Sequence, residues 1–139
     1  MDFCRAVPPA DGFRLDKGTY ETIAFPGASL TVPYRGNNRG QVVGAYILPD
    51  GTPGGRTHGF VYERGRFQTV DGPPRALTEL LGINDRGEIV GGYLDLDGKA
   101  RGLLRDAKGN FTTFSAPQAS SQTGGLDIND RRQIVGIFR

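Results

Sequence analysis

One eleven-residue segment occurs three times in this chain, and its spacing constrains the fold more than any other sequence feature. The copies cover Gly36 to Tyr46, Ile83 to Tyr93 and Ile128 to Phe138. Each copy contains an Asn-x-Arg turn that leads into an apolar strand with a central glycine. The turn asparagines lie 47 and then 45 residues apart. This spacing is typical of a repeat protein with a long period, so the other elements are expected to recur between the copies.

Three further pieces recur with the same period. A strand that begins with glycine covers 12–15, 59–62 and 102–105. After a tight turn, a strand built around an aromatic residue covers 20–23, 67–70 and 111–114. These two pieces predict a hairpin. A third, less regular strand follows a proline and covers 30–32, 77–81 and 125–128; residues 76–81 also favour a helical turn, which is too short to be stable alone.

The strand inside each eleven-residue segment differs from the others because both of its faces are apolar. Val42 to Ile47 and Ile89 to Leu94 contain no charged residue. Since successive side chains of a strand point to opposite faces, these strands should be covered on both sides, with Val43, Val90 and Val135 inaccessible to solvent. The central glycines indicate that another backbone approaches closely, as in a strand lying between two sheets.

Four short antiparallel strands every ~45 residues are typical of a β-propeller blade. The 22 glycines and nine prolines also disfavour long helices. We therefore predict an all-β fold with three four-stranded blade-like repeats in a single domain, 12–139. Residues 1–11 carry Pro8-Pro9 and no periodicity, and we expect them to form a loose N-terminal arm.

Three blades are too few to close a propeller ring, which needs about 4–8. An open array would leave apolar faces in water and sheet edges unpaired. We therefore expect the chain to be half of a six-bladed β-propeller that is closed by homodimerisation through strand exchange. In this prediction the C-terminal strand, Gln133 to Phe138, completes the blade begun by Gly12 to Val32 of the other chain.

The repeats resemble the bacterial HAF-repeat family. The resemblance rests on His58 to Tyr62, on Phe67 to Asp71 and on Ile83 to Gly91. It implies a β-propeller-like fold and an extracellular location, and it carries over no catalytic or ligand-binding residue. Two departures matter. The histidine occurs in one repeat only, and Arg132 stands where the other turns have glycine, which costs ~1 kcal/mol if the position needs a left-handed backbone.

Charge and cysteine content exclude several classes of protein. The chain has 17 basic and 15 acidic residues, a balance that disfavours nucleic acid as a partner. Its one cysteine, Cys4, excludes an internal disulfide. The N-terminal residues lack the apolar stretch of a signal peptide. Nothing approaches the ~20 apolar residues of a membrane span, so no membrane partner is expected.

The turns supply the candidate ligand site. Arg39, Arg86 and Arg131 occupy one position in successive repeats, which a propeller would place on one face around its axis. Such a ring could hold a carboxylate, a phosphate or a sulfated sugar. Asp85 and Asp130 lie next to two of these arginines. The alternative is that these are solvated turn residues, and the turn asparagines are expected to cap their own turns.

Other sequence features give little support for catalysis or metal binding. Asp95 to Gly98 resembles the start of a calcium loop but lacks its later ligands, so a hairpin turn is the preferred interpretation. His58 is the only histidine, so no histidine cluster can bind a metal, and a structural role is preferred. No serine lies in a G-x-S-x-G elbow. We expect no metal and no cofactor.

Together these features predict a non-enzymatic, self-assembling β-propeller module that presents loops for binding a glycan or an acidic small molecule. The alternative is a hydrolase or lyase that acts on a glycan or acidic substrate at the axial ring of arginines and aspartates. A third interpretation is a structural fragment of a longer propeller.

Overall fold

The computed structural model describes residues 9–49, 56–73 and 76–139, and it confirms an all-β fold of antiparallel sheets. Within these residues no helix is long and apolar enough to span a membrane. The strands are β1 (Gly12–Asp16), β2 (Thr19–Ile23), β3 (Leu30–Gly36), β4 (Val42–Leu48), β5 (Arg56–Glu63), β6 (Arg66–Val70), β7 (Leu77–Ile83), β8 (Ile89–Leu94), β9 (Ala100–Arg105), β10 (Phe111–Phe114), β11 (Thr123–Ile128) and β12 (Ile134–Phe138).

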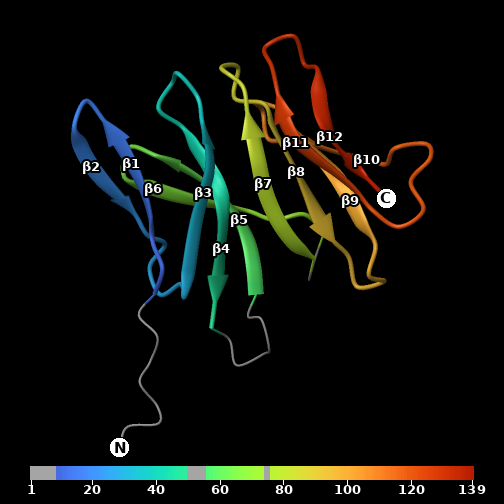
Figure 1. The fold of residues 1–139 in the computed structure, drawn as a ribbon, viewed down its shortest axis with the longest axis horizontal. Helices are drawn as coiled ribbons and strands as arrows, with labels where there is room; N and C mark the ends of the chain where they lie inside the picture. Colours follow the sequence, from blue (N-terminus) through green and yellow to red (C-terminus); the bar gives the residue numbers. More distant parts are fainter. Residues whose placement is uncertain (1–8, 50–55, 74–75) are drawn as a thin grey trace, which may run out of the picture.

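The strands form two complete sheets and two hairpins (Figure 1). The first sheet has the order β3-β4-β5-β6 and the second the order β7-β8-β9-β10. The N-terminal hairpin, β1–β2, and the C-terminal hairpin, β11–β12, are two-stranded. They lie at opposite ends of the molecule's longest axis, with the two complete sheets between them. The arrangement is a row of sheets rather than a closed ring.

The sheets begin at a different strand from the one that the sequence predicted. We expected a single C-terminal strand of one chain to complete the sheet begun by Gly12 to Val32 of the other chain. Instead β3 pairs with β4 and not with β2, and β12 pairs with β11. The segment between β2 and β3 breaks the ladder, because the backbone N–H of Phe25 donates to the Thr31 hydroxyl at 3.0 Å. The described residues therefore form a two-stranded hairpin at each end, beside the two four-stranded sheets.

The central glycines of β4, β8 and β12 lie against another backbone, as predicted. A Cβ atom on Gly44, Gly91 or Gly136 would lie 2.0–2.1 Å from a carbonyl oxygen of the neighbouring strand. That strand belongs to the same sheet, whereas the sequence suggested a strand of an adjacent sheet. It approaches closely because a β-bulge interrupts the pairing at each of these places.

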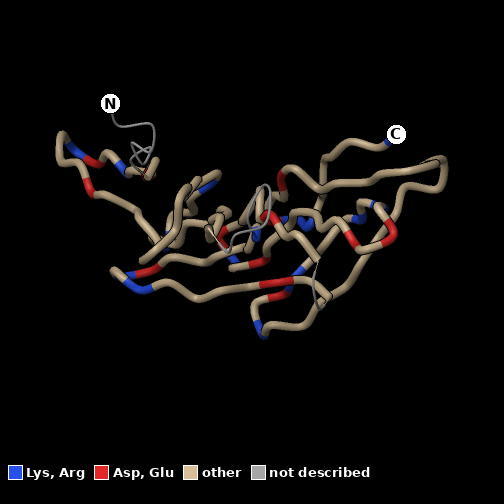
Figure 2. The backbone as a smooth tube through the Cα atoms, turned by 90° about the horizontal axis from the view of Figure 1, so that it is seen from below, with Lys and Arg blue, Asp and Glu red and all other residues tan. Residues whose placement is uncertain are grey.

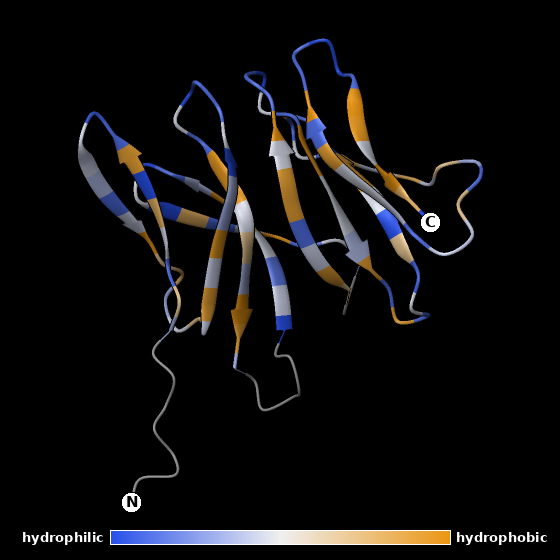
Figure 3. Ribbon diagram, in the orientation of Figure 1, coloured by the Kyte–Doolittle hydropathy of each residue, from blue (hydrophilic) through white to orange (hydrophobic). Residues whose placement is uncertain are grey.

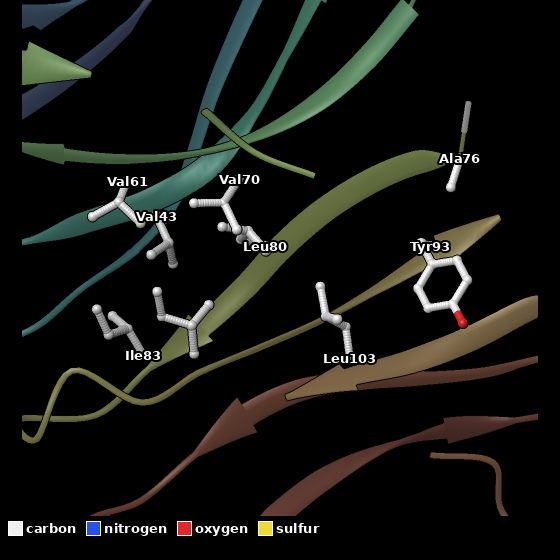
Figure 4. Close-up of a cluster of buried hydrophobic side chains, with 9 residues drawn as sticks. Val43, Val61, Val70, Ala76, Leu80, Ile83, Tyr93 and Leu103 are labelled. Carbon is white, nitrogen blue, oxygen red and sulfur yellow. The ribbon is translucent and has the colours of Figure 1, made fainter. Parts of the chain in front are cut away.

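The main core lies between the first and second sheets (Figure 4). β7 packs across β3, β4 and β5, and β11 packs in the same way across β7, β8 and β9. Figure 4 shows Val43 and Val61 of the first sheet facing Leu80 and Ile83 of β7. The first strand of the second sheet thus packs on the first sheet. The first strand of the C-terminal hairpin packs on the second sheet in the same way.

Val43 and Val90 are fully buried, as predicted, but Val135 is 65% exposed. The prediction fails at Val135 because β12 has a neighbour on only one side. β4 and β8 each lie between two strands of a four-stranded sheet, whereas β12 is the outer strand of a two-stranded one. Figure 3 shows the hydrophobic residues of β12 at this open edge.

The N-terminal hairpin contacts the first sheet in the same way as the second sheet contacts the C-terminal hairpin. Ala10 forms a parallel bridge with Leu30, and Ala100 forms the equivalent bridge with Gln122. A second core cluster joins Ile23 of the hairpin to Val42, Phe60 and other residues of the first sheet. Residues 1–8 of the predicted arm lie outside the described residues. The hairpin therefore occupies the position of the outer half of a preceding sheet.

Candidate functional site

The three asparagine turns are built alike. The side-chain oxygen of Asn37 accepts hydrogen bonds from the backbone N–H groups of Arg39 and Gln41, at 3.1 and 3.0 Å. Asn84 and Asn129 cap their turns with the same two bonds. The predicted capping role is confirmed. It explains why asparagine recurs here, since its short side chain reaches the backbone two residues on.

Each turn is also hydrogen-bonded to the next one. The side-chain amide of Asn37 donates to the carbonyl oxygen of Asn84, and that of Asn84 donates to the carbonyl oxygen of Asn129, both at 3.0 Å. A second set of bonds runs beside the first: the N–H of Asn38 donates to Asp85 at 2.7 Å, and the N–H of Asp85 donates to Asp130 at 2.8 Å. We call this row of bonds the turn ladder. It has a direction, because the first turn donates to the second and the second donates to the third.

The turn ladder brings the predicted ligand residues to one edge of the molecule. Arg39, Arg86 and Arg131 are all exposed there. Asp85 accepts from the backbone and the side chain of Asn38, and these bonds, with the nearby Arg39 charge, hold the pKa of its carboxyl below the ordinary value. Figure 2 shows basic and acidic residues interspersed along the chain. Asp85 and Asp130 thus have structural partners, and ligand binding at the arginines stays a prediction.

Arg132 adopts the left-handed backbone that its position requires. Its φ is 61°, against 82° and 80° for Gly40 and Gly87 at the equivalent positions. The turn keeps the same backbone hydrogen bonds as the other two. Arg132 also forms an ion pair with Glu88, whose side chain is only 7% exposed. The sequence did not reveal this pair, since the two residues belong to different repeats.

His58 has a structural partner in Asp71, which sequence reasoning also missed. The ring nitrogen Nδ1 lies 2.8 Å from an Asp71 carboxylate oxygen. The His58 ring stacks on Tyr46, which in turn stacks on Phe25. The structural interpretation of His58 is therefore favoured, because its ring has both a carboxylate partner and a stacked aromatic neighbour.

Asp95 forms the predicted turn. Its carboxylate accepts from the backbone N–H groups of Asp97 and Lys99, both at 3.0 Å. These bonds, the one from Lys99 above all, lower the pKa of the Asp95 carboxyl. Among the described residues no three His, Cys, Asp or Glu side chains cluster as metal ligands would.

Three threonines recur with the period of the asparagines. Thr31, Thr78 and Thr123 are buried, and each hydroxyl accepts from the backbone of the segment before its strand, at 2.9–3.0 Å. They hold the connection between successive sheets. Their spacing of 47 and 45 residues equals that of the turn asparagines, and this was the signal that could have identified them.

A polar cavity of about 680 Å³ opens between the N-terminal hairpin and the first turn. Its lining includes Arg14, Asp16 and Glu21 of the hairpin and Asn37 and Asn38 of the turn. We call it the hairpin notch. The first turn is the neighbour of the next hairpin, since the side-chain amide of Gln41 donates to Glu63 at 3.4 Å. The matching face of that hairpin also lines a cavity, of about 730 Å³. Among the described residues no turn donates in this way to Asp16, which holds the position of Glu63 in the notch.

Comparisons of this chain with protein-family models, with curated proteins and with solved structures found no match. The resemblance to HAF repeats stays a prediction, and the function is argued from the geometry of the chain alone.

Proposed function

We propose that this chain is a non-enzymatic self-assembling module, two copies of which close a six-bladed β-propeller. One observation carries the proposal: the two end hairpins are complementary halves of the repeating sheet. The C-terminal hairpin corresponds to β3–β4 and β7–β8, and the N-terminal hairpin to β5–β6 and β9–β10. Joined across two chains, in the order β11-β12-β1-β2, they make a third sheet of the same kind.

Solvent exposure at equivalent positions supports this joining. Phe60 and Leu103 are 0% and 1% exposed, whereas Phe13, at the same position of the N-terminal hairpin, is 61% exposed. Phe138 is 50% exposed, although its equivalents Tyr46 and Tyr93 are buried. Covering large apolar side chains stabilises a complex by ~1 kcal/mol or more each, even when they are only half-exposed. The apolar residues that need cover thus lie on the two edges that would meet.

The pairing of the complete sheets predicts the register of the new one. Gly44 pairs with Phe60, and Gly91 pairs with Leu103. By equivalence Gly136 of one copy would pair with Phe13 of the other, and Ile134 with Leu15. Each chain would supply two complete four-stranded sheets and two halves of a sheet. The number of sheets in a closed ring would therefore be a multiple of three. Six is the one such number within the usual 4–8 blades.

The proposal is tested by the mass of the protein in solution. Light scattering at micromolar concentration should give twice the 15.0 kDa of one chain. Val135→Lys should give a folded monomer, because the new charge would be buried in the joined sheet but tolerated at the open edge. Leu96→Lys is the matched control, since Leu96 is 74% exposed in a turn away from both edges. A monomeric wild-type protein, or a dimeric Val135→Lys variant, would refute the proposal.

Anion or glycan binding at the ladder edge is a second candidate function. The observation that favours it is the position of Arg39, Arg86 and Arg131, which are exposed on three adjoining turns. Catalysis at this edge has less support, because the lowered pKa of Asp85 does not suit a general acid. Calorimetry with sulfated oligosaccharides should detect binding by the wild type and none by the triple Arg→Ala variant. Equal affinities would place any binding site elsewhere.

A further inference from the structure

We propose that the Asn129–Arg132 turn of one copy docks in the hairpin notch of the second copy and there continues the turn ladder. This inference rests on the proposed ring closure and names the contact that sets its direction and register. The ladder runs from the first turn to the third within one chain. In a ring, the turn that follows the third is the first turn of the partner chain.

The two ends of the ladder are chemically complementary. The carbonyl oxygens of Asn84 and Asn129 each accept from a neighbouring turn as well as from their own. Within the described part of the chain, the carbonyl oxygen of Asn37 accepts only from Gly40 of its own turn. The side-chain amide of Asn129 likewise donates only to Gln133. One end therefore offers an amide proton and the other an oxygen lone pair, the two groups that join every internal pair of turns.

The notch contains a second matching group. Inside the chain, the amide of Gln41 donates to Glu63, which ends the first strand of the adjoining hairpin. Gln133 occupies the position of Gln41, and Asp16 occupies that of Glu63. The Gln133 side-chain oxygen already accepts from Asn129, so its amide group would point to the partner's Asp16 as that of Gln41 points to Glu63. Both sides of the contact repeat an interaction that the single chain makes.

The direction of the ladder restricts the way in which two copies can meet. A donor turn fits only an acceptor turn, so the contact is head to tail. Two copies that associate in this way around a ring make two identical junctions. A symmetric contact between two C-terminal hairpins would place donor against donor and leave both notches empty. The ladder therefore selects ring closure over other pairings of the exposed edges.

Asn129→Asp is the substitution that tests this contact. The aspartate keeps the oxygen that caps the turn but replaces the donating amide by a second oxygen. We expect the dimer Kd to rise about tenfold or more, since each ring loses two hydrogen bonds and gains two oxygen–oxygen repulsions. Asn37→Asp is the matched control. It makes the same change at a rung inside the chain, and should lower the melting temperature of the dimer more than it raises the dimer Kd.

Asp16→Ala provides a second variant whose fold does not depend on a capped turn, and we expect it to raise the dimer Kd several-fold. Sedimentation over a range of concentrations gives all these constants, and circular dichroism checks each fold. Wild-type affinity in both Asn129→Asp and Asp16→Ala would overturn the docking of the turn. Ring closure would survive that result if Val135→Lys is still monomeric, whereas a monomeric wild-type protein would overturn both proposals.

Discussion

At the scale of single residues, Asn37 and Asn84 each use one side chain for two purposes. The oxygen caps the turn, and the amide group binds the next turn in the row. Aspartate could cap but not donate, and serine is too short to span both contacts. The recurrence of asparagine at this spacing therefore encodes both the local turn and the stacking of one repeat on the next.

Gly91→Val should destabilise the protein by ~1–3 kcal/mol through overpacking. A Cβ at this position would lie 2.0 Å from the carbonyl oxygen of Glu79, beside the β-bulge between β7 and β8. Urea denaturation of the wild type and the variant measures the difference. Gly124→Ala is the control, because its added Cβ meets nothing closer than 4.0 Å. If the two substitutions lower the free energy of unfolding by the same amount, the close approach at Gly91 does not limit packing.

Arg132→Gly should lower stability by ~1 kcal/mol even though it relieves a left-handed backbone. The relief amounts to ~1 kcal/mol, but the nearly buried Glu88 carboxylate loses its cationic partner, which costs ~1–3 kcal/mol. In a Glu88→Gln background that cost disappears, so the same change should be neutral or stabilising. With both changes, the second and third turns each carry the Gly-Gln sequence of Gly40–Gln41 in the first turn.

A double-mutant cycle by thermal denaturation measures this coupling. If Arg132→Gly has the same effect with Glu88 and with Gln at that position, the ion pair contributes nothing, and the arginine is merely tolerated.

At the scale of elements, the sequence predicted the strands well and their grouping less well. Period-two alternation and the glycine-ended turns located the hairpins β1–β2, β5–β6 and β9–β10. The grouping was missed because β2 and β3 are contiguous in the repeat but belong to different sheets. What separates them is a connection held by the hydrogen bond from the backbone of Phe25 to the Thr31 hydroxyl. A side chain that anchors a connection leaves no alternation pattern in the sequence.

The candidate site was predictable in its parts but not in its connections. Identical spacing indicated that Asn37, Asn84 and Asn129 are equivalent, and capping followed from residue type. The bonds from one turn to the next join residues 45 and 47 positions apart, and no local pattern encodes them. The same holds for His58. The repeat indicated its position in the strand, but no local pattern indicated Asp71 as its hydrogen-bond partner.

The N-terminal hairpin should loosen at low pH through Glu21. This carboxylate accepts from Tyr62 of β5 and from Arg14, both at 2.6 Å, and these bonds lower its pKa below the ordinary 4.5. A lowered folded-state pKa adds stability above the ordinary pKa, and that stability is lost as the pH falls through the folded-state value.

The melting temperature of the wild type should therefore exceed that of Glu21→Gln near neutral pH, and the gap should close as the pH falls below about 4. A gap that stays constant down to pH 2 would show that the charge on Glu21 does not hold the hairpin.

At the scale of the whole molecule, the repeat explains why one chain leaves two edges open. Each sheet covers its predecessor through its first strand, so the row can continue in both directions. The residues that would be internal in a longer row, such as Phe13 and Val135, are large and apolar. Exposed edges of this kind favour aggregation unless they are paired. The proposed closure with a second copy would pair both edges by means of contacts that the chain already makes internally.

The number of repeats was readable from the sequence, whereas the need for a partner was inferred from it and stays a prediction. The strand composition of the junction was not, because it depends on which strands share a sheet. The sequence predicted that the C-terminus would supply one strand to the joined sheet. The structure has the hairpin β11–β12 there, so the C-terminus would supply two of the four strands.

Both proposals require β12 of one copy to pair with β1 of the partner, and disulfide trapping tests this pairing. In a Cys4→Ser background, a Leu15→Cys chain is mixed with an Ile134→Cys chain. The predicted register places these residues opposite each other, within the reach of a disulfide. Phe13→Cys with Ile134→Cys is the control, because diagonal neighbours lie about 7–8 Å apart. We expect a covalent dimer of the two different chains under mild oxidation, with little in the control. No covalent dimer, or equal trapping in both mixtures, would contradict this pairing.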